Sequence, residues 1–324
     1  MSQADAGVLV GLDVGGTKTH LRVVGADGAA GAAGGAADGA DVLVDDVLVD
    51  DVLVDDVAPS AGWSALPVDG AADWIAQRVR THTAGRVLAG VGVGAQGCEE
   101  REHTDALARR LRTLLGAPVT VVNDAELLVP AAGHTVGVGV IVGTGAIAVA
   151  TTAGGGMARA GGWGWVLSDD GSASALVREA ARAVLARADR GAELDELGRL
   201  LLASVGVDSV AGLAHALSWD PGVETWGTHA RAVTTAADRG SVAALEVLDR
   251  GADAVADLVR VLHARGVDVR HVVVAGGVAV AVPRLFERLR AGVEATVPGA
   301  RVELLEGPPV RGAVVLARRA AAAG

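Results

Sequence analysis

The sequence of 324 residues has one cysteine, one phenylalanine and no tyrosine. The single cysteine, Cys98, excludes an intramolecular disulfide framework, a cysteine-based zinc site and a self-contained iron–sulfur cluster. A protein that binds nucleic acid needs a basic face and aromatic side chains on which bases stack, and this composition favours neither. The apolar runs are short, and none approaches the roughly 20 residues that cross a bilayer. We therefore expect neither nucleic acid nor membrane partners.

Positive charge is also scarce, and the acidic excess is local. The net charge is −11, but the segment from Asp38 to Asp56 contains eight aspartates and no basic residue, so the rest of the chain carries −3 (−11 + 8). The first residues, MSQADAG, lack the basic and apolar stretches of a secretory signal. These features predict a cytoplasmic protein, and the length predicts two domains or one large one.

The first half of the chain alternates between strand and helix patterns. A short apolar run, the turn Gly15-Gly16 and a second alternating run predict a β-hairpin, not the strand–loop–helix of a Walker A motif. The strands and helices that follow predict an α/β domain. The predicted strands are 8–12, 19–24, 87–93 and 119–122, and the predicted helices are 71–81 and 104–115.

The second half begins with the same pattern and then becomes helical. Predicted strands 137–142 and 146–151 flank a glycine turn, as the first two strands do. After the glycine-rich stretch 154–164, we predict helices 172–187, 193–203, 228–239, 241–264, 283–290 and 311–322, and a strand at 272–275. The fold class is therefore α/β, with two domains. We expect an N-terminal domain of residues 1–133, completed by the C-terminal helix 311–324, and a second domain of residues 134–310 with helical insertions.

Residues 41–55 are the pentapeptide DVLVD written three times. An odd period places successive copies on opposite faces of a strand, because strand side chains alternate with a period of two. We interpret the repeat as an expansion of a loop or edge strand with two surplus copies, since long surface insertions cost little loop entropy. Metal binding by the paired aspartates is the alternative.

Three glycine turns are candidate phosphate or nucleotide sites. In the segment Asp13-Val14-Gly15-Gly16-Thr17-Lys18, a hairpin tip without side chains can bring backbone N–H groups close to phosphate oxygens. Asp13 could hold Mg²⁺ through water. Taken alone, the hairpin is better explained by an ordinary tight turn. Gly143-Thr144-Gly145 forms a second tip of this kind, and two facing tips would clamp a polyphosphate. Gly276-Gly277, after a buried strand, offers a third backbone surface for an adenine or ribose.

Asn123-Asp124 follows the apolar strand 119–122, and Asn123 is the only asparagine of the chain. A carboxylate at the carboxyl end of a strand lies where α/β sheets bind ligands. One interpretation of Asp124 is a general base for a sugar hydroxyl, because phosphoryl transfer needs an oriented nucleophile. The other is an N-cap for the residues from Ala125 onward. Spacing alone does not separate them.

The most distinctive stretch is GGWGWVLSDDGS at residues 161–172. Trp163 lies between glycines, which offer it no packing partner, so we expect its ring to contact a ligand. An aromatic surface with aspartate acceptors such as Asp169 suits a sugar, which has apolar faces and hydroxyl edges. Asp170 or Ser172 could instead cap the following helix.

Taken in order, these motifs resemble the actin-like ATPase superfamily of sugar kinases, heat-shock proteins and actin. More narrowly, they resemble the N-acetylglucosamine kinase branch of the BadF/BadG/BcrA/BcrD group. The segments that carry the resemblance are GLDVGGTKT, VVNDA, VGTGA, GGWGWVLSDDGSA, VVVAGGV and PPVRGAVVLA. It covers the chain except residues 29–56. It implies two actin-like (ribonuclease H-like) α/β domains with a cleft between them, ATP and Mg²⁺ as cofactors, an aminosugar as substrate, transfer to a hydroxyl such as the 6-OH, and a homodimer.

The resemblance also implies roles for individual residues. Asp124 would be the catalytic base, and Asp13 would hold Mg²⁺ through water. The ATP- and phosphate-binding residues would be Gly15, Gly16, Thr17, Lys18, Gly143, Thr144, Gly145, Gly276 and Gly277. The sugar-binding residues would be Gln96, Gly97, Asn123, Asp124, Gly162, Trp163 and Asp169.

This chain departs from the family pattern at two places that bear on the sugar. Ala146-Ile147 stands where the acetylglucosamine kinases carry Ser-Asn, and residues 60–63, SAGW, stand where they place a sugar-binding asparagine. Two other functions stay open. An activator ATPase of an acyl-CoA dehydratase or reductase would need two cluster cysteines per subunit, and Cys98 stands alone. A non-catalytic sugar sensor is disfavoured by Asp124.

Overall fold

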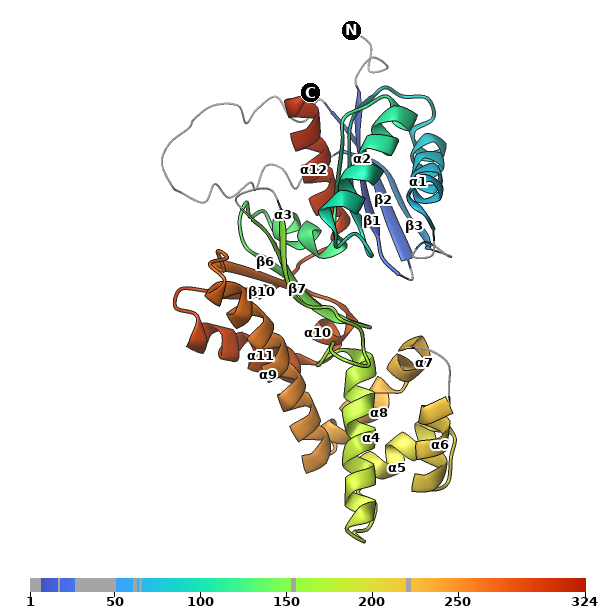
Figure 1. The fold of residues 1–324 in the computed structure, drawn as a ribbon, viewed down its shortest axis with the longest axis vertical. Coiled ribbons are helices and arrows are strands. Elements are labelled where there is room, and N and C mark those ends of the chain that lie inside the picture. Colours follow the sequence, from blue (N-terminus) through green and yellow to red (C-terminus); the bar gives the residue numbers. More distant parts are fainter. Residues whose placement is uncertain are drawn as a thin grey trace. The chain divides into compact units, whose positions relative to one another are not determined.

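The computed structural model describes residues 7–16, 18–26, 51–60, 63, 66–152, 156–219 and 223–324. The chain divides into unit 1 (Met1–Gly139, Ala150–Met157, Leu305–Gly324) and unit 2 (Val140–Val149, Ala158–Leu304). Two five-stranded sheets with helices make up the fold, which confirms the predicted α/β class (Figure 1). The domain boundaries expected at 133/134 and 310/311 stay a prediction.

The sheet of unit 1 has the strand order β3-β2-β1-β4-β5. Strand β1 pairs antiparallel with β2 and parallel with β4, and β4 pairs parallel with β5. The elements are β1 (Val8–Val14), β2 (Lys18–Gly25), β3 (Val52–Pro59), α1 (Val68–Thr83), β4 (Leu88–Ala95), α2 (Arg101–Leu115), β5 (Val119–Val122), the 3₁₀ turn η4 (Asp124–Leu127), α3 (Leu128–Ala131) and α12 (Val310–Ala323). The predicted hairpin and the predicted order of strands and helices are therefore present.

Helices cover both faces of this sheet, with α1 and α2 on one face and α12 on the other (Figure 1). The alternation of β1 explains the division. Val8, Val10, Leu12 and Val14 belong to the larger core cluster, with buried residues of α1 and α2. Leu9 points the other way and packs with residues of α12. A strand buried on both faces needs an almost continuous apolar sequence, as β1 has.

Glycines in β1 and β4 let α12 approach the sheet at backbone distance. A Cβ added at Gly92 would lie 2.0 Å from the carbonyl oxygen of Ala313, and one at Gly90 would lie 2.3 Å from that of Ala317. Glycine weakens an isolated strand, so its presence here indicates a close backbone approach. The LAGVGVGA sequence of β4 is thus shaped by its contact with α12.

The second sheet has the strand order β10-β9-β6-β7-β8, and β9 and β10 are parallel. Its strands are β6 (Val138–Val142), β7 (Ala146–Thr151), β8 (Met157–Gly161), β9 (His271–Ala275) and β10 (Arg301–Leu304). The helices of unit 2 are α4 (Ala173–Asp189), α5 (Glu196–Val205), α6 (Val210–Trp219), α7 (Val223–Thr228), α8 (Ala230–Asp238), α9 (Val242–Ala264), α10 (Gly277–Ala281) and α11 (Pro283–Thr296). Strands β8 and β10 and helices α6, α7 and α10 were not predicted from the sequence.

The third copy of the DVLVD repeat lies at the edge of the first sheet, as predicted. It enters β3, whose Asp55 accepts hydrogen bonds from Arg22 at 3.0 and 2.9 Å and lies 2.7 Å from Nε2 of His20. Asp56 lies 3.3 Å from Nε2 of His82. Arginine and histidine side chains therefore surround this pair of aspartates. The first two copies, residues 41–50, lie outside the described residues.

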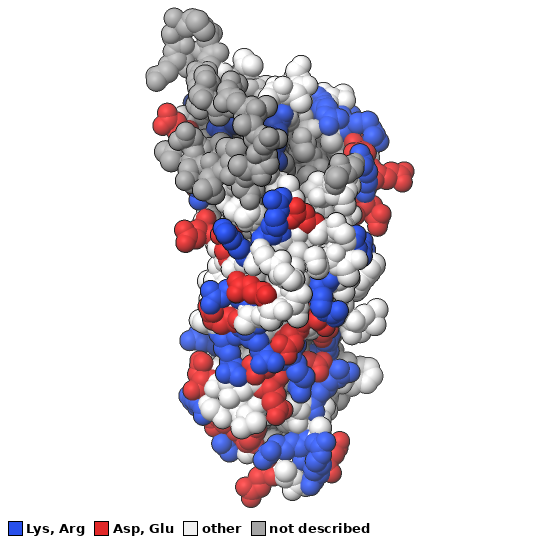
Figure 2. Space-filling model, turned by 90° about the vertical axis from the view of Figure 1, so that its left-hand side faces the viewer, with Lys and Arg blue, Asp and Glu red and all other residues white. Residues whose placement is uncertain are grey.

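Basic and acidic side chains are interspersed over the described part of the face drawn in Figure 2. In unit 2, bidentate ion pairs link helices α9 and α11, namely Arg284 with Asp249 and Arg288 with Asp253. Within the described residues, no single helix is long and apolar enough to cross a membrane. Only the pair α5 and α6, bent by 50°, meets that test of length and composition.

Candidate active site

Two carboxylates of unit 1 lie at the carboxyl ends of the parallel strands β1 and β5, which flank β4 in the sheet. Asp13 of β1 is opposite Gly94 of β4, which is opposite Val122 of β5. Asp124 follows two residues later, in the turn η4. Because β1, β4 and β5 run in the same direction, their carboxyl ends meet at one edge, where α/β sheets bind ligands.

Asn123, and not Asp124, is the N-cap of the turn that follows β5. Its Oδ1 accepts a hydrogen bond from the backbone N–H of Ala125 at 3.1 Å, and Oε2 of Glu126 accepts one from the backbone N–H of Asn123 at 3.0 Å. This reciprocal pair is a capping box. Asp124 accepts from the same Ala125 N–H at 3.0 Å through Oδ1. The capping function is therefore met by Asn123, which leaves Asp124 available for another one.

The environment of both carboxylates disfavours their charged form. Burial, followed by the negative charges of Asp13 and Glu99, raises the pKa of Asp124 to about 7, and hydrogen bonds from the backbone oppose this rise. Burial also raises the pKa of Asp13 to about 6, while the charge of Lys18 lowers it. Clustered carboxylates with raised pKa values are typical of catalytic sites, although structural networks also produce them.

The first glycine hairpin lies beside this pair of carboxylates. Gly15 N–H donates to the carbonyl oxygen of Lys18 at 3.0 Å, which closes the turn. A Cβ added at Gly16 would lie 2.5 Å from Oε1 of Gln96. Gln96 and Gly97 are exposed and follow directly after β4, so this predicted sugar-binding pair adjoins the predicted phosphate hairpin. Thr17, predicted to contact phosphate, lies outside the described residues.

Trp63 forms a hydrogen bond with the backbone of Gln96. Its ring is buried, and its Nε1–H donates to the carbonyl oxygen of Gln96 at 3.0 Å. In the same segment the Ser60 hydroxyl is fully buried, 2.8 Å from the hydroxyl of Thr19. Ser60 and Trp63 both contribute to the packing of unit 1 through these contacts.

In unit 2, the second glycine hairpin lies beside Gly276 and Gly277. Gly143 N–H donates to the carbonyl oxygen of Gly145 at 2.9 Å, and a Cβ added at Gly143 would lie 3.9 Å from Gly276 Cα and from Gly277 N. The strands that carry the two turns, β6 and β9, are neighbours in the sheet. The structure therefore brings together the predicted phosphate loop and the predicted adenosine motif, with Thr144 exposed at the tip.

Gly276 and Gly277 differ in whether the local structure requires a glycine. Gly276 has φ 111°, and its Cβ would lie 2.3 Å from the carbonyl oxygen of Val142, so no other residue fits there. Gly277 is exposed, and no atom lies within 4 Å of the position its Cβ would take. Only Gly277 leaves free space for a ligand to approach its backbone.

The glycines around Trp163 are required by the local backbone. Gly161, Gly162 and Gly164 have φ values of 75°, 70° and 91°, and a Cβ at Gly162 would lie 2.6 Å from Ile147. The Trp163 side chain is 64% exposed, and the guanidinium of Arg159 lies 4.2 Å from the centroid of its ring. One face of the ring therefore has a partner that the sequence did not reveal, and most of the side chain is open to solvent.

Asp169 is a buried carboxylate with one unpaired oxygen. Its residue is 8% exposed, its φ is 59°, and its Oδ1 has no hydrogen-bond partner in the described structure. Burial raises its pKa, and hydrogen bonds from the backbone of Gly164 and Ala146 lower it in part. Leaving such an acceptor unpaired costs about 1–3 kcal/mol, so a ligand hydroxyl would gain from donating to it.

Ser172 and Asp170, which lie close to Asp169 in the sequence, both form interactions within unit 2. Ser172 caps α4, with its hydroxyl accepting from Ala175 N–H at 3.2 Å. Asp170 forms an ion pair with Arg178 at 2.6 Å, and Arg178 also donates to the carbonyl oxygens of Trp165 and Ser168. Arg178 thus holds the loop that carries Asp169.

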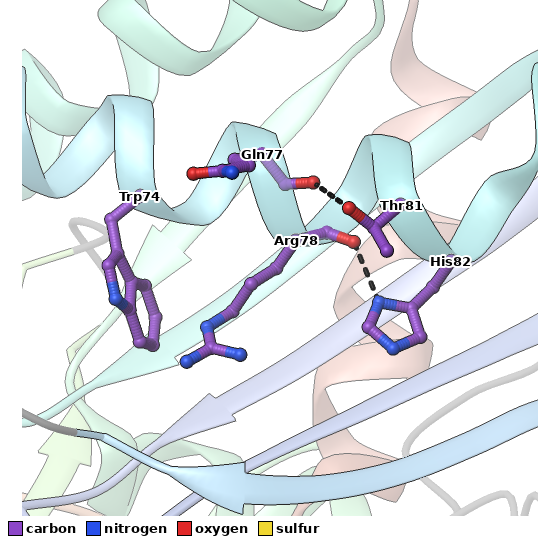
Figure 3. Close-up of a pocket in the computed structure, with 5 residues that line it drawn as sticks. All are labelled: Trp74, Gln77, Arg78, Thr81 and His82. Carbon is purple, nitrogen blue, oxygen red and sulfur yellow. Dashed lines mark hydrogen bonds between the residues drawn. The ribbon is translucent and has the colours of Figure 1, made fainter.

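A hollow of about 270 Å³ lies along helix α1, apart from these residues (Figure 3). It is lined by Trp74, Gln77, Arg78, Thr81 and His82. The guanidinium of Arg78 lies 3.9 Å from the centroid of the Trp74 ring, and its Nη2 donates to Pro59 O at 3.2 Å. None of the predicted site residues lines this hollow, whose side chains tie α1 to the edge strand β3.

The residues present fit a nucleotide and a magnesium ion in the way the motifs suggest. Within the described residues no three His, Cys, Asp or Glu side chains form a metal cage. Mg²⁺ usually keeps several waters and binds one or two carboxylates together with substrate phosphates. Asp13 can provide one such carboxylate. The hairpin at 15–16 and the paired glycine turns of unit 2 offer backbone N–H groups to phosphates.

Three residues near the predicted site were not found from the sequence. Glu99 acts on Asp124 through its charge, Arg159 covers Trp163, and Glu126 completes the capping box. The spacing Asn-x-x-Glu is the one signal that could have revealed Glu126, because it is the pattern of a capping box. The other two depend on loop conformation, which the sequence does not display.

Known proteins share both the sequence pattern and the fold. The chain is 26% identical over 234 residues to the N-acetylmuramic acid/N-acetylglucosamine kinase of Clostridium acetobutylicum, covering 70% of this chain and 76% of that one. The structure of a protein provisionally assigned as N-acetylglucosamine kinase, from Chromobacterium violaceum, superposes with a TM-score of 0.69 at 21% identity, covering 96% and 99% of the two chains.

A ROK family glucokinase from Streptomyces griseus, solved with glucose and AMPPNP, has a TM-score of 0.54 at 19% identity, covering 96% and 98%. At these identities the structural likeness establishes the fold, which is that of the actin-like sugar kinases. The model of the BadF/BadG/BcrA/BcrD ATPase family matches residues 10–317, nearly the whole chain, and the predicted resemblance is confirmed. The chain therefore belongs to the BadF/BadG/BcrA/BcrD ATPase family.

Proposed function

We propose that this protein is an ATP-dependent kinase that phosphorylates a hydroxyl, the 6-OH, of an aminosugar such as N-acetylglucosamine or glucosamine. The observation that carries the proposal is Asp124. It lies at the carboxyl edge of the sheet, beside Asp13 and the first glycine hairpin. Asn123, and not Asp124, is the N-cap of the turn that follows β5. A relative from Clostridium acetobutylicum that is 26% identical is named as a kinase of this substrate class.

In the proposed reaction, Asp124 acts as general base. The sugar oxygen forms a bond to the γ-phosphorus of ATP, the bond from that phosphorus to the β,γ-bridging oxygen breaks, and ADP leaves. The hydroxyl proton passes to the Asp124 carboxylate. A pKa of about 7 suits this role, because the carboxylate is then ionised near neutral pH yet basic enough to accept a proton.

The nucleotide contacts are proposed on the glycine turns. Gly15, Gly16, Thr17 and Lys18 would contact phosphate from unit 1, and residues 143–145 would do so from unit 2. Gly276 and Gly277 would lie along the adenosine, with Gly277 offering the open backbone surface. Mg²⁺, held through water by Asp13, would neutralise charge on the phosphates.

The sugar contacts are proposed on both units. Trp163 would provide an exposed aromatic surface, and the unpaired Oδ1 of Asp169 would accept a hydrogen bond from a hydroxyl. Gln96, Gly97, Asn123 and Gly162 complete the proposed set. The homodimer and the cytoplasmic location stay predictions.

The alternative of an activator ATPase has little support from Cys98. This thiol is buried, and burial with the nearby charges of Asp124 and Glu99 raises its pKa to about 12. A cluster ligand must be a thiolate, which such a site disfavours.

A screen of ATP consumption over a panel of hexoses and aminosugars tests the proposal. We expect ADP formation to depend on an aminosugar, and NMR of the product to locate the phosphate on O6. Asp124→Asn should lower the rate of that ADP formation by about 10²- to 10⁴-fold. ATP hydrolysis that no sugar stimulates, or a product phosphorylated elsewhere, would contradict the substrate or the position proposed.

A further inference from the structure

The carboxylate of Glu126 accepts hydrogen bonds from two segments that are distant in the sequence. Its Oε2 accepts from the backbone N–H of Asn123 at 3.0 Å, and its Oε1 accepts from the hydroxyl of Thr151 at 2.8 Å. Thr151 is the last residue of β7. Burial raises the pKa of Glu126, and these two hydrogen bonds oppose that rise. The side chain is thus a link between the turn that carries Asp124 and the end of β7.

This link holds the backbone of Asp124 from its amino side. Asn123 is held by Glu126, and Ala125 is held by the Asn123 side chain, so the residue between them has little freedom. From the other side, Ala125 packs so closely against β6 that a Cβ at Gly139 would lie 2.1 Å from its carbonyl oxygen. Two side chains therefore hold the residues on either side of Asp124: Asn123 accepts from the backbone N–H of Ala125, and Glu126 accepts from the backbone N–H of Asn123.

The partner strand gives the link a functional context. Strand β7 begins at Ala146, directly after the second glycine hairpin, and ends at Thr151. One end of β7 therefore adjoins the hairpin proposed to bind phosphate, and its other end bonds to the turn of the proposed base. A general base must lie within hydrogen-bond distance of the proton it removes, so a small displacement of this turn lowers the rate of transfer.

We propose that Glu126, together with Thr151, is a positioning residue for Asp124, so that the pair sets the rate of phosphoryl transfer and not substrate affinity. The inference rests on the proposed kinase function. It assigns no direct contact with substrate to either residue. It requires that the hydrogen bonds of Glu126 matter, and not its negative charge.

The variants Glu126→Ala and Glu126→Gln separate these two possibilities. Alanine removes both hydrogen bonds, and we expect kcat to fall by about 10- to 100-fold, with both KM values within about threefold. Glutamine removes the charge but keeps the bonds, because its amide oxygen can accept from Asn123 N–H and its NH₂ can donate to the turned hydroxyl of Thr151. Its kcat should stay within about threefold of wild type. Equal losses in both variants would overturn the proposal.

A double variant tests whether Glu126 acts through Asp124. In an Asp124→Asn background the base is already absent, so Glu126→Ala should cause no further loss of residual turnover. An additive loss would show an independent effect and refute the positioning role. If Glu126→Ala does not fold, Thr151→Val removes one of the two bonds with little change in shape and should lower kcat, while Thr151→Ser should restore it.

Thr152→Val serves as the matched control, because the Thr152 hydroxyl donates to the carbonyl oxygen of Gly156 at 3.0 Å and not to the base turn. It should leave kcat unchanged. The wild-type measurement separates the two levels of inference. A wild-type protein inactive towards every sugar contradicts the kinase function itself. An active wild type whose kcat survives Glu126→Ala contradicts the positioning role alone.

Discussion

Replacing Asp124 by asparagine should strongly lower activity and make the folded protein more stable at neutral and alkaline pH. The carboxyl group has its pKa raised from 3.8 to about 7, chiefly by burial. A residue that is retained although it destabilises the fold has a functional reason to be there. A residue retained as a helix cap has the opposite signature, because its loss lowers stability.

The magnitude and the pH range follow from linkage. Below pH 3.8 the carboxyl is neutral in both the folded and the unfolded chain. Between there and pH 7 the unfolded chain ionises first, so the free energy of unfolding falls as the pH rises. Each pKa unit corresponds to about 1.36 kcal/mol, so a rise from 3.8 to about 7 corresponds to roughly 4 kcal/mol at most. The negative charge of Asp13 contributes to this rise after burial.

Unfolding of wild type and Asp124→Asn, measured by urea titration from pH 4 to pH 8, provides the assay. The stability advantage of the variant should be small at pH 4, grow through pH 5–7 and level off above about pH 7. Asp73→Asn, on the exposed face of α1, is the matched control and should follow the wild-type curve. Turnover of Asp124→Asn should fall by about 10²- to 10⁴-fold. A gap that does not change with pH, or a variant less stable than wild type at pH 8, would refute the argument.

The other predictions concern the sugar site, the adenosine turn and the repeat. Trp163→Ala should raise the sugar KM at least about tenfold, while the ATP KM changes by less than about threefold. Asp169→Ala should lower kcat/KM for the sugar by an amount equivalent to about 1–3 kcal/mol. Weakened ATP binding with unchanged sugar kinetics would place both residues on the nucleotide side. Gly276→Ala should lower the stability of the fold by about 1–3 kcal/mol in a thermal melt. Gly277→Ala should leave the melting temperature unchanged and raise the ATP KM. The reverse pattern would contradict the structural role of Gly276 and the nucleotide contact proposed for Gly277. Deleting residues 46–55 should change stability and kinetic constants little, and a variant that fails to fold would show that the deleted copies are part of the sheet or of an interface.

Much of the fold could be predicted because most of its strands and helices have a regular apolar pattern. The predicted strand 119–122 and the predicted strand 146–151 coincide with β5 and β7. The missed strands carry weaker signals. Strand β10 has only four residues, with one buried, and β8 lies in a segment whose glycines indicated a loop. Its Gly161 ends the strand with a positive φ, so the sequence mixes a strand signal with a turn signal.

The sequence predicts the residue types of the candidate site, but not the groups that each side chain contacts. The sequence placed Asn123 and Asp124 together after a strand, and it left open which of them caps the turn. The difference depends on the direction of one side-chain oxygen, that of Asn123 towards Ala125 N–H. Arg159 illustrates the same limit, because its position over the Trp163 ring depends on the glycine backbone between them.

The glycines show how a functional motif and a packing constraint are superimposed in one stretch of sequence. Each glycine turn was interpreted as an approach surface for phosphate or nucleotide, but glycine is also required where φ is positive or where another backbone comes close. Gly276 meets both structural requirements, so its identity says nothing about a ligand. Gly277 meets neither, since its Cβ would extend into open space and its φ lies outside the left-handed region. An alanine at the first position of α10 would cost the fold nothing, because alanine is the best helix former. Gly277 is therefore the glycine at which the proposed nucleotide contact can be tested by substitution without a change in packing.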